Sequence, residues 1–296
     1  MERLGARWCA GRMTESPILV LGARGKTGRR VTARLTALGV PVRAASRSTG
    51  TIFEWADRDT WGPALDGARA VYLVPMNESV DQDAVAEFAD AAVAAGVRRL
   101  VLLAARGAGG GPQPAQEPAE RAVRASGAEW TILRPAWFAQ NFSEDFFREP
   151  LLAGVLALPT GEGREAFVDA GDIADVAVAA LTGAGHAGEV YELSGPEPLT
   201  FGAAVRMIAE ASGREIRYTP VEVPEFTAML ESLGVPAAFA EMLAGLLTTL
   251  RDGDGDRVGD GVRRALGRDP RPFAEYVKEA AAAGAWAAAP ADQRGR

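Results

Sequence analysis

The sequence predicts an α/β fold: a Rossmann doubly wound parallel sheet with a smaller, mainly helical C-terminal lobe. Two observations carry this prediction. Short apolar runs alternate with helical patterns through the first half of the chain, without the turn signals of β-hairpins. A glycine-rich turn joins the first apolar run to the first helical pattern, as at the start of a βαβ unit. The 296 residues are enough to bury a core without disulfides or metal ions.

The first half of the chain contains the elements of the sheet in regular order. Apolar runs predict strands at residues 18–21, 40–46, 70–75, 98–105 and 130–135. Helical patterns lie between residues 28 and 39, and at 81–95 and 119–126. Because helices connect successive strands, we expect parallel strands whose carboxyl ends meet at one edge of the sheet.

The pattern changes after residue 135. An aromatic-rich segment is followed by a short strand, an amphipathic helix at 172–181, and helices within 224–250 whose apolar faces carry Met, Leu and Phe. We expect a loose extension at 1–16 and a Rossmann core at 17–150. The C-terminal part, 151–296, is expected to add strands to the core and to form a helical lobe of a size suited to cover a small molecule.

The charge balance and the scarcity of Cys and His exclude several classes of site. Lys and Arg number 32 against 39 Asp and Glu, so the net charge of −7 argues against a broad nucleic-acid-binding face. The single cysteine, Cys9, excludes an internal disulfide and a Cys-rich zinc site. The single histidine, His186, excludes a cluster of His ligands, so we expect no metal.

The hydropathy pattern gives no sign of a membrane protein. No apolar run reaches the roughly 18 residues that span a bilayer. The first twelve residues lack the apolar stretch of a secretion signal. We therefore expect a cytoplasmic protein, a monomer or weak homodimer, whose partner is a small molecule.

A glycine-rich turn with the spacing GxxGxxG follows the first strand. Glycine permits the tight turn and lets backbone N–H groups approach a pyrophosphate, which the N-terminus of the next helix stabilises. In a βαβ unit this spacing predicts a dinucleotide site, the alternative being a glycine-rich turn without a ligand. The turn consists of Gly22, Ala23, Arg24, Gly25, Lys26, Thr27 and Gly28.

The end of the second strand indicates which dinucleotide is bound. An acidic residue there would bind the ribose hydroxyls of NAD, but this strand ends in Ser46 and Arg47. Arg47 and Arg24 are bidentate donors that suit the 2′-phosphate of NADP(H). The sequence therefore favours NADPH; the alternative is that Arg47 is merely solvated.

Several longer segments carry a family resemblance that spans residues 17–286. They are GARGKTG, RAASRS, FEWADRDTW, AVYLVP, WTILRP, WFAQNF, VYELSGPEPLTF and ALGRDPRPFAEY. The chain resembles NmrA-like atypical short-chain dehydrogenases/reductases, and more narrowly an actinobacterial branch that includes ketoreductases of aromatic polyketides. The resemblance implies NADP(H) binding, with Asp57 approaching the adenine. It also implies nicotinamide contacts from Val74, Pro75, Met76, Ala104 and Ala105, and Arg106 beside the substrate.

One departure from the wider superfamily concerns the proton donor. Ordinary short-chain reductases protonate the alkoxide from the Tyr of a YxxxK motif, helped by a Ser after the fifth strand. Here no Tyr is followed by Lys at the fourth position, and the serine position reads Ala104-Ala105. Two interpretations remain: a sensor that binds NADP(H) without catalysis, or a reductase whose proton comes from a substrate hydroxyl or an ordered water.

The residues after the last predicted core strand are the candidates for substrate contact. They are Trp137, Phe138, Asn141 and Phe142, with Met229 from the helical lobe. Aromatic and Met side chains suit a large flat ligand. Asn141 would orient a carbonyl or a carboxamide; the alternative is a bond to its own backbone.

Three other polar residues are assigned no catalytic role. Asp172 and Asp175 are expected to cap and orient a helix, and His186 to lie in a surface turn. We therefore expect an NADPH-dependent ketoreductase of an aromatic polyketide of the angucyclinone type, acting in antibiotic biosynthesis. The alternatives are a non-catalytic NADP(H)-sensing regulator and an NADPH quinone reductase.

Overall fold

The computed structural model describes residues 16–75 and 82–287. They form two compact units. Unit 1 comprises the described part of Met1–Pro135 together with Ala170–Leu193 and Asp260–Arg268. Unit 2 comprises Ala136–Asp169, Ser194–Gly259 and the described part of Asp269–Arg296. The first boundary between the units thus follows Pro135, whereas the sequence alone suggested a boundary near residue 150.

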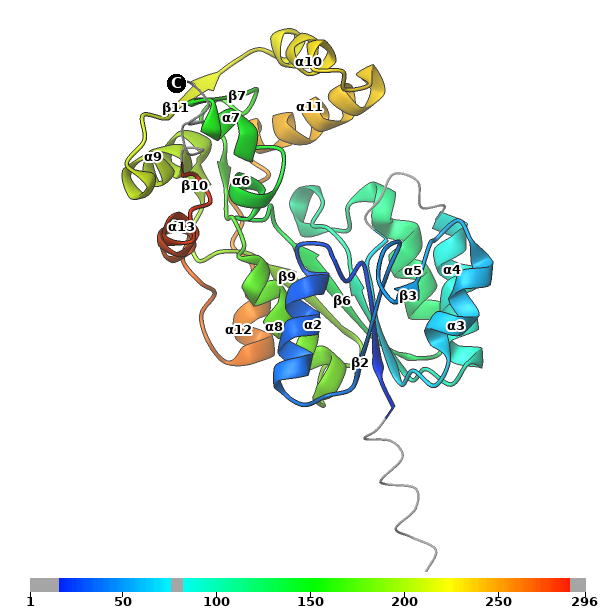
Figure 1. The fold of residues 1–296 in the computed structure, drawn as a ribbon. Helices are drawn as coiled ribbons and strands as arrows, with labels where there is room; N and C mark the ends of the chain where they lie inside the picture. Colours follow the sequence, from blue (N-terminus) through cyan, green and yellow to red (C-terminus); the bar gives the residue numbers. More distant parts are fainter. Residues whose placement is uncertain (1–15, 76–81, 288–296) are drawn as a thin grey trace, which may run out of the picture. The chain divides into compact units, whose positions relative to one another are not determined.

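Unit 1 is built on a parallel sheet of seven strands in the order β3-β2-β1-β4-β5-β6-β9, which confirms the predicted doubly wound fold (Figure 1). The order reverses between β1 and β4, so their carboxyl ends flank the switch point where such sheets bind ligands. The strands are β1 (Ile18–Leu21), β2 (Val42–Ser46), β3 (Thr51–Ile52), β4 (Ala70–Leu73), β5 (Arg99–Leu103), β6 (Glu129–Pro135) and β9 (Glu189–Leu193).

Helices cover both faces of this sheet (Figure 1). One face carries α2 (Gly28–Ala37), α8 (Ala170–Thr182) and α12 (Gly261–Leu266); the other carries α3 (Trp61–Leu65), α4 (Gln82–Ala94) and α5 (Glu117–Ala125). Strands β1, β4 and the last four residues of β5 are buried along their length, because helices exclude water from both sides. This explains why these strands read as continuous apolar runs.

An aromatic cluster fixes the segment that follows β3. Phe53, Trp55, Trp61 and Phe88 pack edge to face, with ring centroids 5.2–6.3 Å apart. The Trp61 indole also donates a hydrogen bond to the Glu54 carbonyl at 3.1 Å. Aromatic contacts of this kind add about 0.5–1.5 kcal/mol each beyond area burial. The backbone on either side of Glu54 is therefore held against the core.

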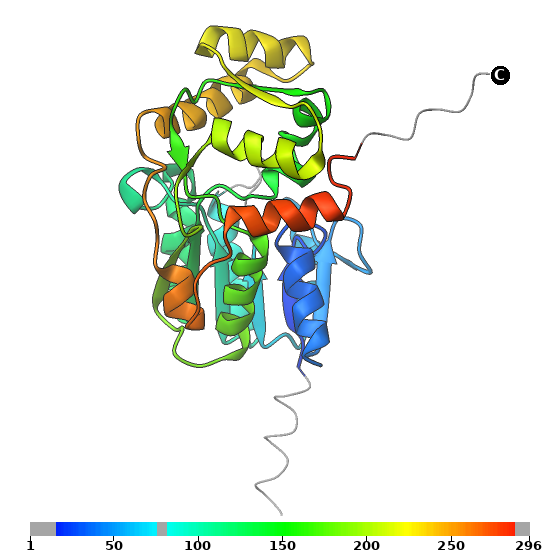
Figure 2. The same cartoon turned by 90° about the vertical axis from the view of Figure 1, so that its left-hand side faces the viewer.

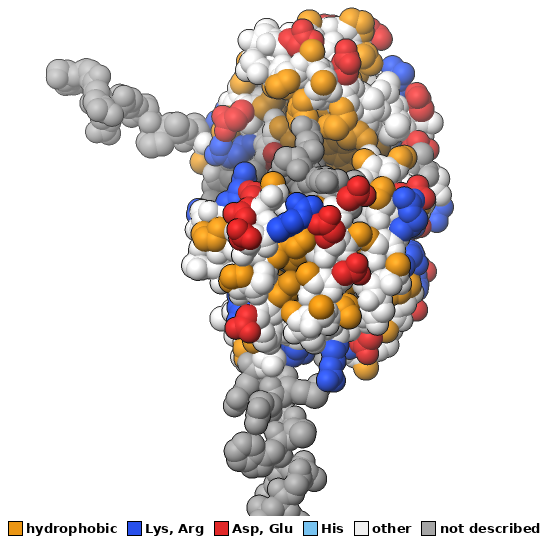
Figure 3. Space-filling model, turned by 90° about the vertical axis from the view of Figure 1, so that its right-hand side faces the viewer, with side chains coloured by type: hydrophobic (Ala, Val, Ile, Leu, Met, Phe, Trp, Pro, Cys, Tyr) orange, Lys and Arg blue, Asp and Glu red, His pale blue; other side chains and the backbone are white. Residues whose placement is uncertain are grey.

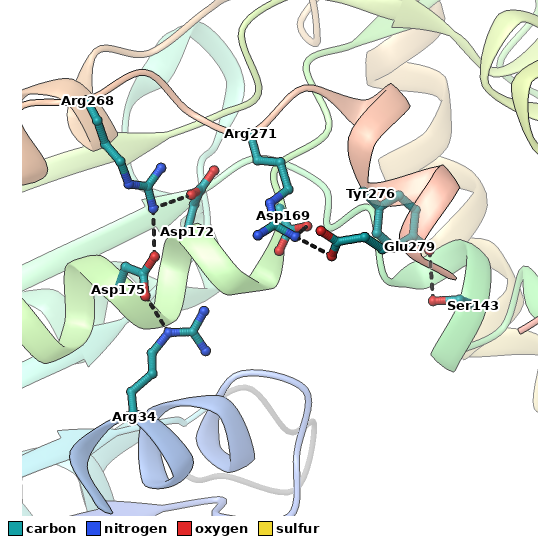
Figure 4. Close-up of polar contacts among 9 residues, drawn as sticks. All are labelled: Arg34, Ser143, Asp169, Asp172, Asp175, Arg268, Arg271, Tyr276 and Glu279. Atoms are coloured by element: carbon teal, nitrogen blue, oxygen red, sulfur yellow. Dashed lines mark hydrogen bonds and ion pairs between the residues drawn. The ribbon is translucent and has the colours of Figure 1, made fainter. Parts of the chain in front are cut away.

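Ion pairs tie the helices on the α2 face together (Figure 4). Asp175 of α8 accepts from Arg34 of α2, and its second oxygen lies 2.6 Å from the Arg268 guanidinium. Arg268 also reaches the buried Asp172 at 2.7 Å. Burial by itself would lower the pKa of Arg268, but the two carboxylates outweigh it and raise that pKa. Both aspartates thus orient α8 through ion pairs; Asp172 lies in the first turn of the helix, whereas Asp175 lies beyond it and is not a cap.

Unit 2 is mainly helical, as the sequence predicts, with two small sheets. Its helices are α6 (Asn141–Glu144), α7 (Arg148–Leu152), α9 (Phe201–Ser212), α10 (Val223–Ser232), α11 (Ala237–Arg251) and α13 (Phe273–Ala282). Strand β7 (Val155–Leu158) pairs in parallel with β11 (Arg217–Pro220), and β8 (Arg164–Glu165) pairs antiparallel with β10 (Leu199–Thr200). Helices α9 and α13 lie side by side (Figure 2).

Polar contacts anchor α13 within unit 2 (Figure 4). The Tyr276 hydroxyl bonds the Ser143 hydroxyl at 2.8 Å, and the Trp286 indole donates to the Phe142 carbonyl at 2.7 Å. Arg271 reaches Glu279 at 2.7 Å and the buried Asp169 at 3.7 Å. The Tyr276–Ser143 bond joins α13 to α6, and the other contacts hold the segments on either side of α13.

Several broad features of the described residues bear on function. None of their helices combines the length and apolar character needed to cross a bilayer. No group of three His, Cys, Asp or Glu side chains gathers among residues 16–75 and 82–287 as a metal site would require. On the face shown in Figure 3, positive and negative side chains are interspersed.

Candidate cofactor site

The glycine turn lies at the carboxyl end of β1. Gly22 has a φ of +61°, a left-handed conformation that favours glycine. The turn closes through a 2.8 Å hydrogen bond from the Gly25 N–H to the Gly22 carbonyl. Ala23 donates to the Ala45 carbonyl of β2 at 3.1 Å, which fixes the turn against the neighbouring strand.

The third glycine, Gly28, allows α2 to begin directly against this turn. A Cβ on Gly28 would lie 2.2 Å from the Gly22 carbonyl oxygen, and a Cβ on Gly25 would lie 3.2 Å from the same atom. Backbone surrounds Gly28, so no side chain can move aside to make room. The spacing of the three glycines is therefore required by the close approach of helix and turn.

The first turn of α2 suits an anion. Thr27 occupies the N-cap position, but its side chain makes no capping hydrogen bond, and the first turn contains no acidic residue. Helix N-termini present backbone N–H groups and a positive dipole end. The residues present therefore fit the pyrophosphate of a dinucleotide, with glycines for close approach and α2 for charge.

The turn after β2 holds the arginine of the glycine turn. Arg24 donates from Nη1 to the Ser48 hydroxyl at 3.0 Å. The Ser48 N–H in turn donates to the Ser46 hydroxyl at 3.2 Å. Arg24 is therefore held at the turn that follows β2, which also contains Arg47; that the two arginines bind the 2′-phosphate stays a prediction.

Glu54 is a residue that sequence reasoning missed. The carboxylate lies 3.9 Å from Nε of Arg47, whose side chain is 77% exposed. Glu54 follows the two-residue strand β3, which pairs with the end of β2. An acid does therefore stand beside the end of β2, although none occurs within the strand itself. Only the pairing of β3 with β2 reveals it.

Asp57, predicted to approach the adenine, shapes its own loop. Its carboxylate accepts a 3.2 Å hydrogen bond from the Asp59 N–H and caps the short helix Arg58–Thr60. The side chain is exposed. Asp57 remains a candidate adenine contact whose loop position is set by this cap.

The predicted nicotinamide contacts follow β4 and β5. Val74 lies beside the glycine turn, 3.5 Å from the position of a Cβ on Gly22, and Pro75 is buried. Ala104 is fully buried and donates its N–H to Leu133 at 2.8 Å, while Ala105 is half-buried. Met76 lies outside the described residues.

The loop after β5 is held in a defined shape. The Arg106 N–H donates to the Pro135 carbonyl at 3.1 Å, and Arg106 also pairs with Pro112 in an antiparallel bridge. The Arg106 side chain is half-buried. Where the superfamily carries a serine, this loop therefore presents two alanines and then a guanidinium.

A buried ion pair supports the same loop. Arg134 donates to both carboxylate oxygens of Glu120 at 2.7 Å, and the two side chains are 13% and 4% exposed. The hydrogen bond to Glu120 raises the pKa of Arg134. Arg134 also reaches the Gly110 carbonyl at 3.4 Å. The end of β6, α5 and the loop are thereby linked within unit 1.

Three of the four tyrosines have raised pKa values, and the fourth is hydrogen-bonded to a serine. Tyr72 lies fully buried in β4, where burial raises its pKa well above the ordinary value, partly opposed by the nearby Thr27 hydroxyl. Burial also raises the pKa values of Tyr191 and Tyr218. A general acid near neutral pH needs a lowered phenol pKa instead. Tyr276 is engaged with Ser143.

His186 precedes β9, at the amino edge of the sheet. Its Nδ1 lies 2.9 Å from the Tyr191 hydroxyl. Burial, with the positive charge of Arg99, lowers the pKa of His186, while Glu189 opposes the shift. The histidine lies in a turn, as predicted, but it is half-buried. It is at the opposite edge from the glycine turn.

The predicted substrate residues of unit 2 have different surroundings. Trp137 stacks on Phe147 with centroids 6.1 Å apart, and Phe138 is half-buried and pairs with Val168. Asn141 begins α6, nearly buried, and its N–H donates to the Phe138 carbonyl at 3.0 Å. This bond is made by the main chain, so the role predicted for the Asn141 side chain stays a prediction.

Phe142 corrects the prediction. The side chain has no exposed surface and packs against four other phenylalanines of the unit 2 core. A side chain surrounded in this way contributes to packing and does not contact a substrate. Met229, by contrast, is exposed on α10, together with Leu233, Phe239 and Met242 of α10, α11 and their connection. We call these four side chains the α10–α11 apolar surface.

Comparison with known proteins identifies the family. Residues 22–184 match the model of a family described as NAD(P)H-binding. The chain belongs to this family. The match begins at the first glycine of the turn and covers the elements that carry the cofactor site, in agreement with the resemblance to NmrA-like atypical short-chain dehydrogenases/reductases.

Several relatives are named as oxidoreductases, reductases or dehydrogenases. YesF of Bacillus subtilis, named an uncharacterized oxidoreductase, is 33% identical, over 91% of this chain and 97% of its own. A reductase of (4-alkanoyl-5-oxo-2,5-dihydrofuran-3-yl)methyl phosphate from Streptomyces griseus is 36% identical, over 90% and 98%. An NADPH-dependent quinone oxidoreductase of Escherichia coli, complexed with NADPH, has the same fold, with a TM-score of 0.75, 24% identity and coverage of 88% and 99%. The chain therefore belongs to an NAD(P)H-binding family whose relatives include oxidoreductases.

Proposed function

We propose that this protein uses NADPH to reduce a ketone of an aromatic polyketide, and that the proton comes from a hydroxyl of the substrate beside that ketone. The observation that carries the proposal is the composition of the carboxyl ends of β4 and β5. Their described residues are Val74, Pro75, Ala104, Ala105 and Arg106. None of these side chains is an acid that donates a proton near neutral pH.

The binding role of the chain is divided between two ends of the cofactor. Gly22, Gly25 and Gly28 would accept the pyrophosphate at the N-terminus of α2. The arginines beside the end of β2, Arg24 and Arg47, place positive charge near the 2′-phosphate, which charge-assisted hydrogen bonds would hold. The reduced nicotinamide, when bound, supplies a hydride.

The reaction needs a source for one proton. Hydride addition to a ketone places negative charge on the carbonyl oxygen, which then needs a proton. Tyr72, Tyr191 and Tyr218 have raised pKa values. Arg106 lies on the loop after β5, and its positive charge would stabilise the negatively charged carbonyl oxygen. A guanidinium retains its protons, however, so Arg106 would not supply the proton. A hydroxyl peri to the ketone lies within hydrogen-bond reach of that oxygen, so the substrate can protonate itself and recover its own proton from water.

The substrate class is inferred from apolar side chains and from one relative. Trp137 and Phe138 follow β6 directly, and Met229 belongs to the α10–α11 apolar surface. Aromatic and Met side chains grip flat ring systems by contact area. The Streptomyces griseus relative, by its name, reduces a ring compound that carries an oxo and an alkanoyl group. The place of this function in antibiotic biosynthesis rests on the resemblance to ketoreductases of aromatic polyketides alone.

The absence of an acid among the described residues at the carboxyl ends of β4 and β5 also favours a second candidate, an NADPH quinone reductase. Hydride addition to a quinone yields a phenolate-like anion, which is a far weaker base than an alkoxide. Such a reaction needs no strong proton donor in the protein. The non-catalytic NADP(H) sensor is the third outcome, and it predicts binding without turnover.

Transfer of deuterium from 4-deuterated NADPH separates these functions. The acceptors are 8-hydroxy-1-tetralone, a peri-hydroxy ketone, and menadione, a quinone without such a hydroxyl. We expect deuterium on the carbinol carbon of the tetralone product, detected by mass spectrometry. Turnover of menadione alone would favour the quinone reductase and contradict the proposal. Tight NADPH binding with no turnover of either compound would identify a sensor.

A further inference from the structure

The two arginines near the 2′-phosphate position stand in unlike environments. Arg24 donates to the neutral Ser48 hydroxyl at 3.0 Å, so its full positive charge is retained. Arg47 lies 3.9 Å from the Glu54 carboxylate and is 77% exposed. An anion near Arg47 therefore meets a pair of opposite charges, whereas an anion near Arg24 meets a cation alone.

The backbone of Ser48 is itself held in place. The Ser48 N–H donates to Ser46 Oγ at 3.2 Å, and Ser46 Oγ lies 3.3 Å from the Thr49 hydroxyl. Thr49 donates to the Thr51 carbonyl of β3 at 2.8 Å. Hydroxyl–backbone bonds of this kind rigidify a turn. A fixed Ser48 in turn restricts the long Arg24 side chain before the cofactor binds. Less rotamer freedom is then lost on binding, and this loss would otherwise weaken the affinity.

Glu54 is fixed as firmly as Ser48. Its carboxylate accepts from the Trp55 N–H at 3.0 Å, its carbonyl accepts from the Trp61 indole, and its N–H donates to the Thr60 hydroxyl at 3.1 Å. The backbone of Glu54 is thus held on both sides, and the Trp55 N–H keeps the carboxylate close to it. Its charge opposes the 2′-phosphate.

We propose that Ser48 is a positioning residue for Arg24, that Arg24 rather than Arg47 selects the 2′-phosphate, and that Glu54 limits the preference for NADPH over NADH. The inference rests on the NADPH preference contained in the proposed function. The inference assigns the preference for NADPH to Arg24. The Ser48 hydroxyl holds Arg24 in place, and the Glu54 carboxylate weakens the preference.

The test is the ratio of the dissociation constants for NADH and NADPH, measured by fluorescence titration of the full chain. A general disturbance of the fold changes both constants, whereas a change at the 2′-phosphate changes their ratio. We expect Arg24→Ala to lower the ratio at least about tenfold and Arg47→Ala to lower it by less than about threefold. Ser48→Ala should lower it about three- to fivefold, because Arg24 loses its anchor but keeps its charge.

Two variants test the assignments in the opposite direction. Ser48→Thr keeps the hydroxyl and should restore the ratio to within about twofold of wild type. Glu54→Gln should raise the ratio about three- to tenfold, because a charge repelling the phosphate disappears. The matched controls are Ser126→Ala and Glu129→Gln. Both residues lie at the opposite edge of the sheet, where Ser126 bonds turn backbone and Glu129 pairs with Arg99.

The outcomes separate this inference from the proposed function. If wild type binds both cofactors equally and Arg24→Ala changes nothing, the NADPH preference itself is wrong. If wild type prefers NADPH but Ser48→Ala and Glu54→Gln leave the ratio unchanged, only the roles of Ser48 and Glu54 are wrong. A larger loss in Arg47→Ala than in Arg24→Ala would also overturn the inference.

Discussion

Replacement of Gly28 by alanine is the most direct structural test of the dinucleotide site. A Cβ at this position would lie 2.2 Å from the Gly22 carbonyl oxygen and 3.0 Å from Ala23 Cα, both backbone atoms. Ordinary van der Waals contact begins at 3.4 Å, so the turn has to open by more than 1 Å. This moves the N-terminus of α2 away from the position where it would meet the pyrophosphate.

The size of the effect follows from the contacts that are lost. Charge-assisted hydrogen bonds from backbone N–H groups contribute about 1.5–3 kcal/mol each. The loss of two such bonds raises the dissociation constant for NADPH at least about a hundredfold. The strain itself lowers the free energy of unfolding by about 1–3 kcal/mol. Gly25→Ala, whose Cβ meets the same oxygen at 3.2 Å, should give a smaller loss of affinity.

Isothermal titration with NADPH measures the affinity, and thermal unfolding measures the stability. The matched control is Gly62→Ala in α3, where an added Cβ meets no atom within 4 Å. We expect this control to bind NADPH as wild type does, with equal or slightly higher stability. If folded Gly28→Ala binds NADPH within about threefold of wild type, the glycine turn is not the pyrophosphate site.

Three further predictions concern other parts of unit 1 and the tyrosines. Tyr→Phe at any of the four tyrosines should leave kcat within about tenfold of wild type, because a true general acid contributes about 10²–10⁴-fold; a thousandfold loss in a folded variant would reveal a phenolic acid. Glu120→Ala should lower the free energy of unfolding by about 3–5 kcal/mol in urea titration, since it leaves the buried Arg134 unpaired, whereas Glu120→Leu with Arg134→Met should cost much less; equal losses would refute this account. The lowered pKa of His186 means that the native state resists protonation, so stability is complete above the ordinary histidine pKa of about 6.5 and declines as pH falls towards the native value. His186→Asn should remove that part of the decline between about pH 7.5 and 5.5 in thermal unfolding, and an identical decline in both proteins would contradict the assignment.

The parallel sheet and the glycine turn are predictable from sequence because their signals are local. Strands β1, β4 and β5 are buried on both faces and therefore read as apolar runs without alternation. The GxxGxxG spacing reflects contacts within seven residues, such as that between Gly28 and Gly22. Both features can therefore be predicted without knowing which distant residues contact them.

The sequence analysis did not predict two contacts that join distant parts of the chain. Asp175 was expected to cap a helix, but its partners Arg34 and Arg268 lie 141 and 93 residues away in sequence. Glu54 reaches Arg47 only because the two-residue strand β3 pairs with β2. Sequence patterns contain no signal for either pairing.

Phe142 illustrates a different limit. The segment from Trp137 to Phe147 contains five aromatic residues, and the sequence does not show which of them face the core. The short helix α6 turns Phe142 into the phenylalanine cluster, whereas Phe146 remains 42% exposed. An aromatic-rich segment therefore predicts apolar contacts without distinguishing packing from binding.

The central claim, that the substrate supplies the proton, is tested most directly by single-turnover reduction of two matched ketones at saturating NADPH. The pair is 8-hydroxy-1-tetralone and 8-methoxy-1-tetralone, which differ in one methyl group. We predict that the methoxy ketone binds within about tenfold of the hydroxy ketone, because contact area dominates binding, and is reduced at least about a hundredfold more slowly. Equal rates of reduction would show that the proton comes from the protein or its water, and would contradict the account.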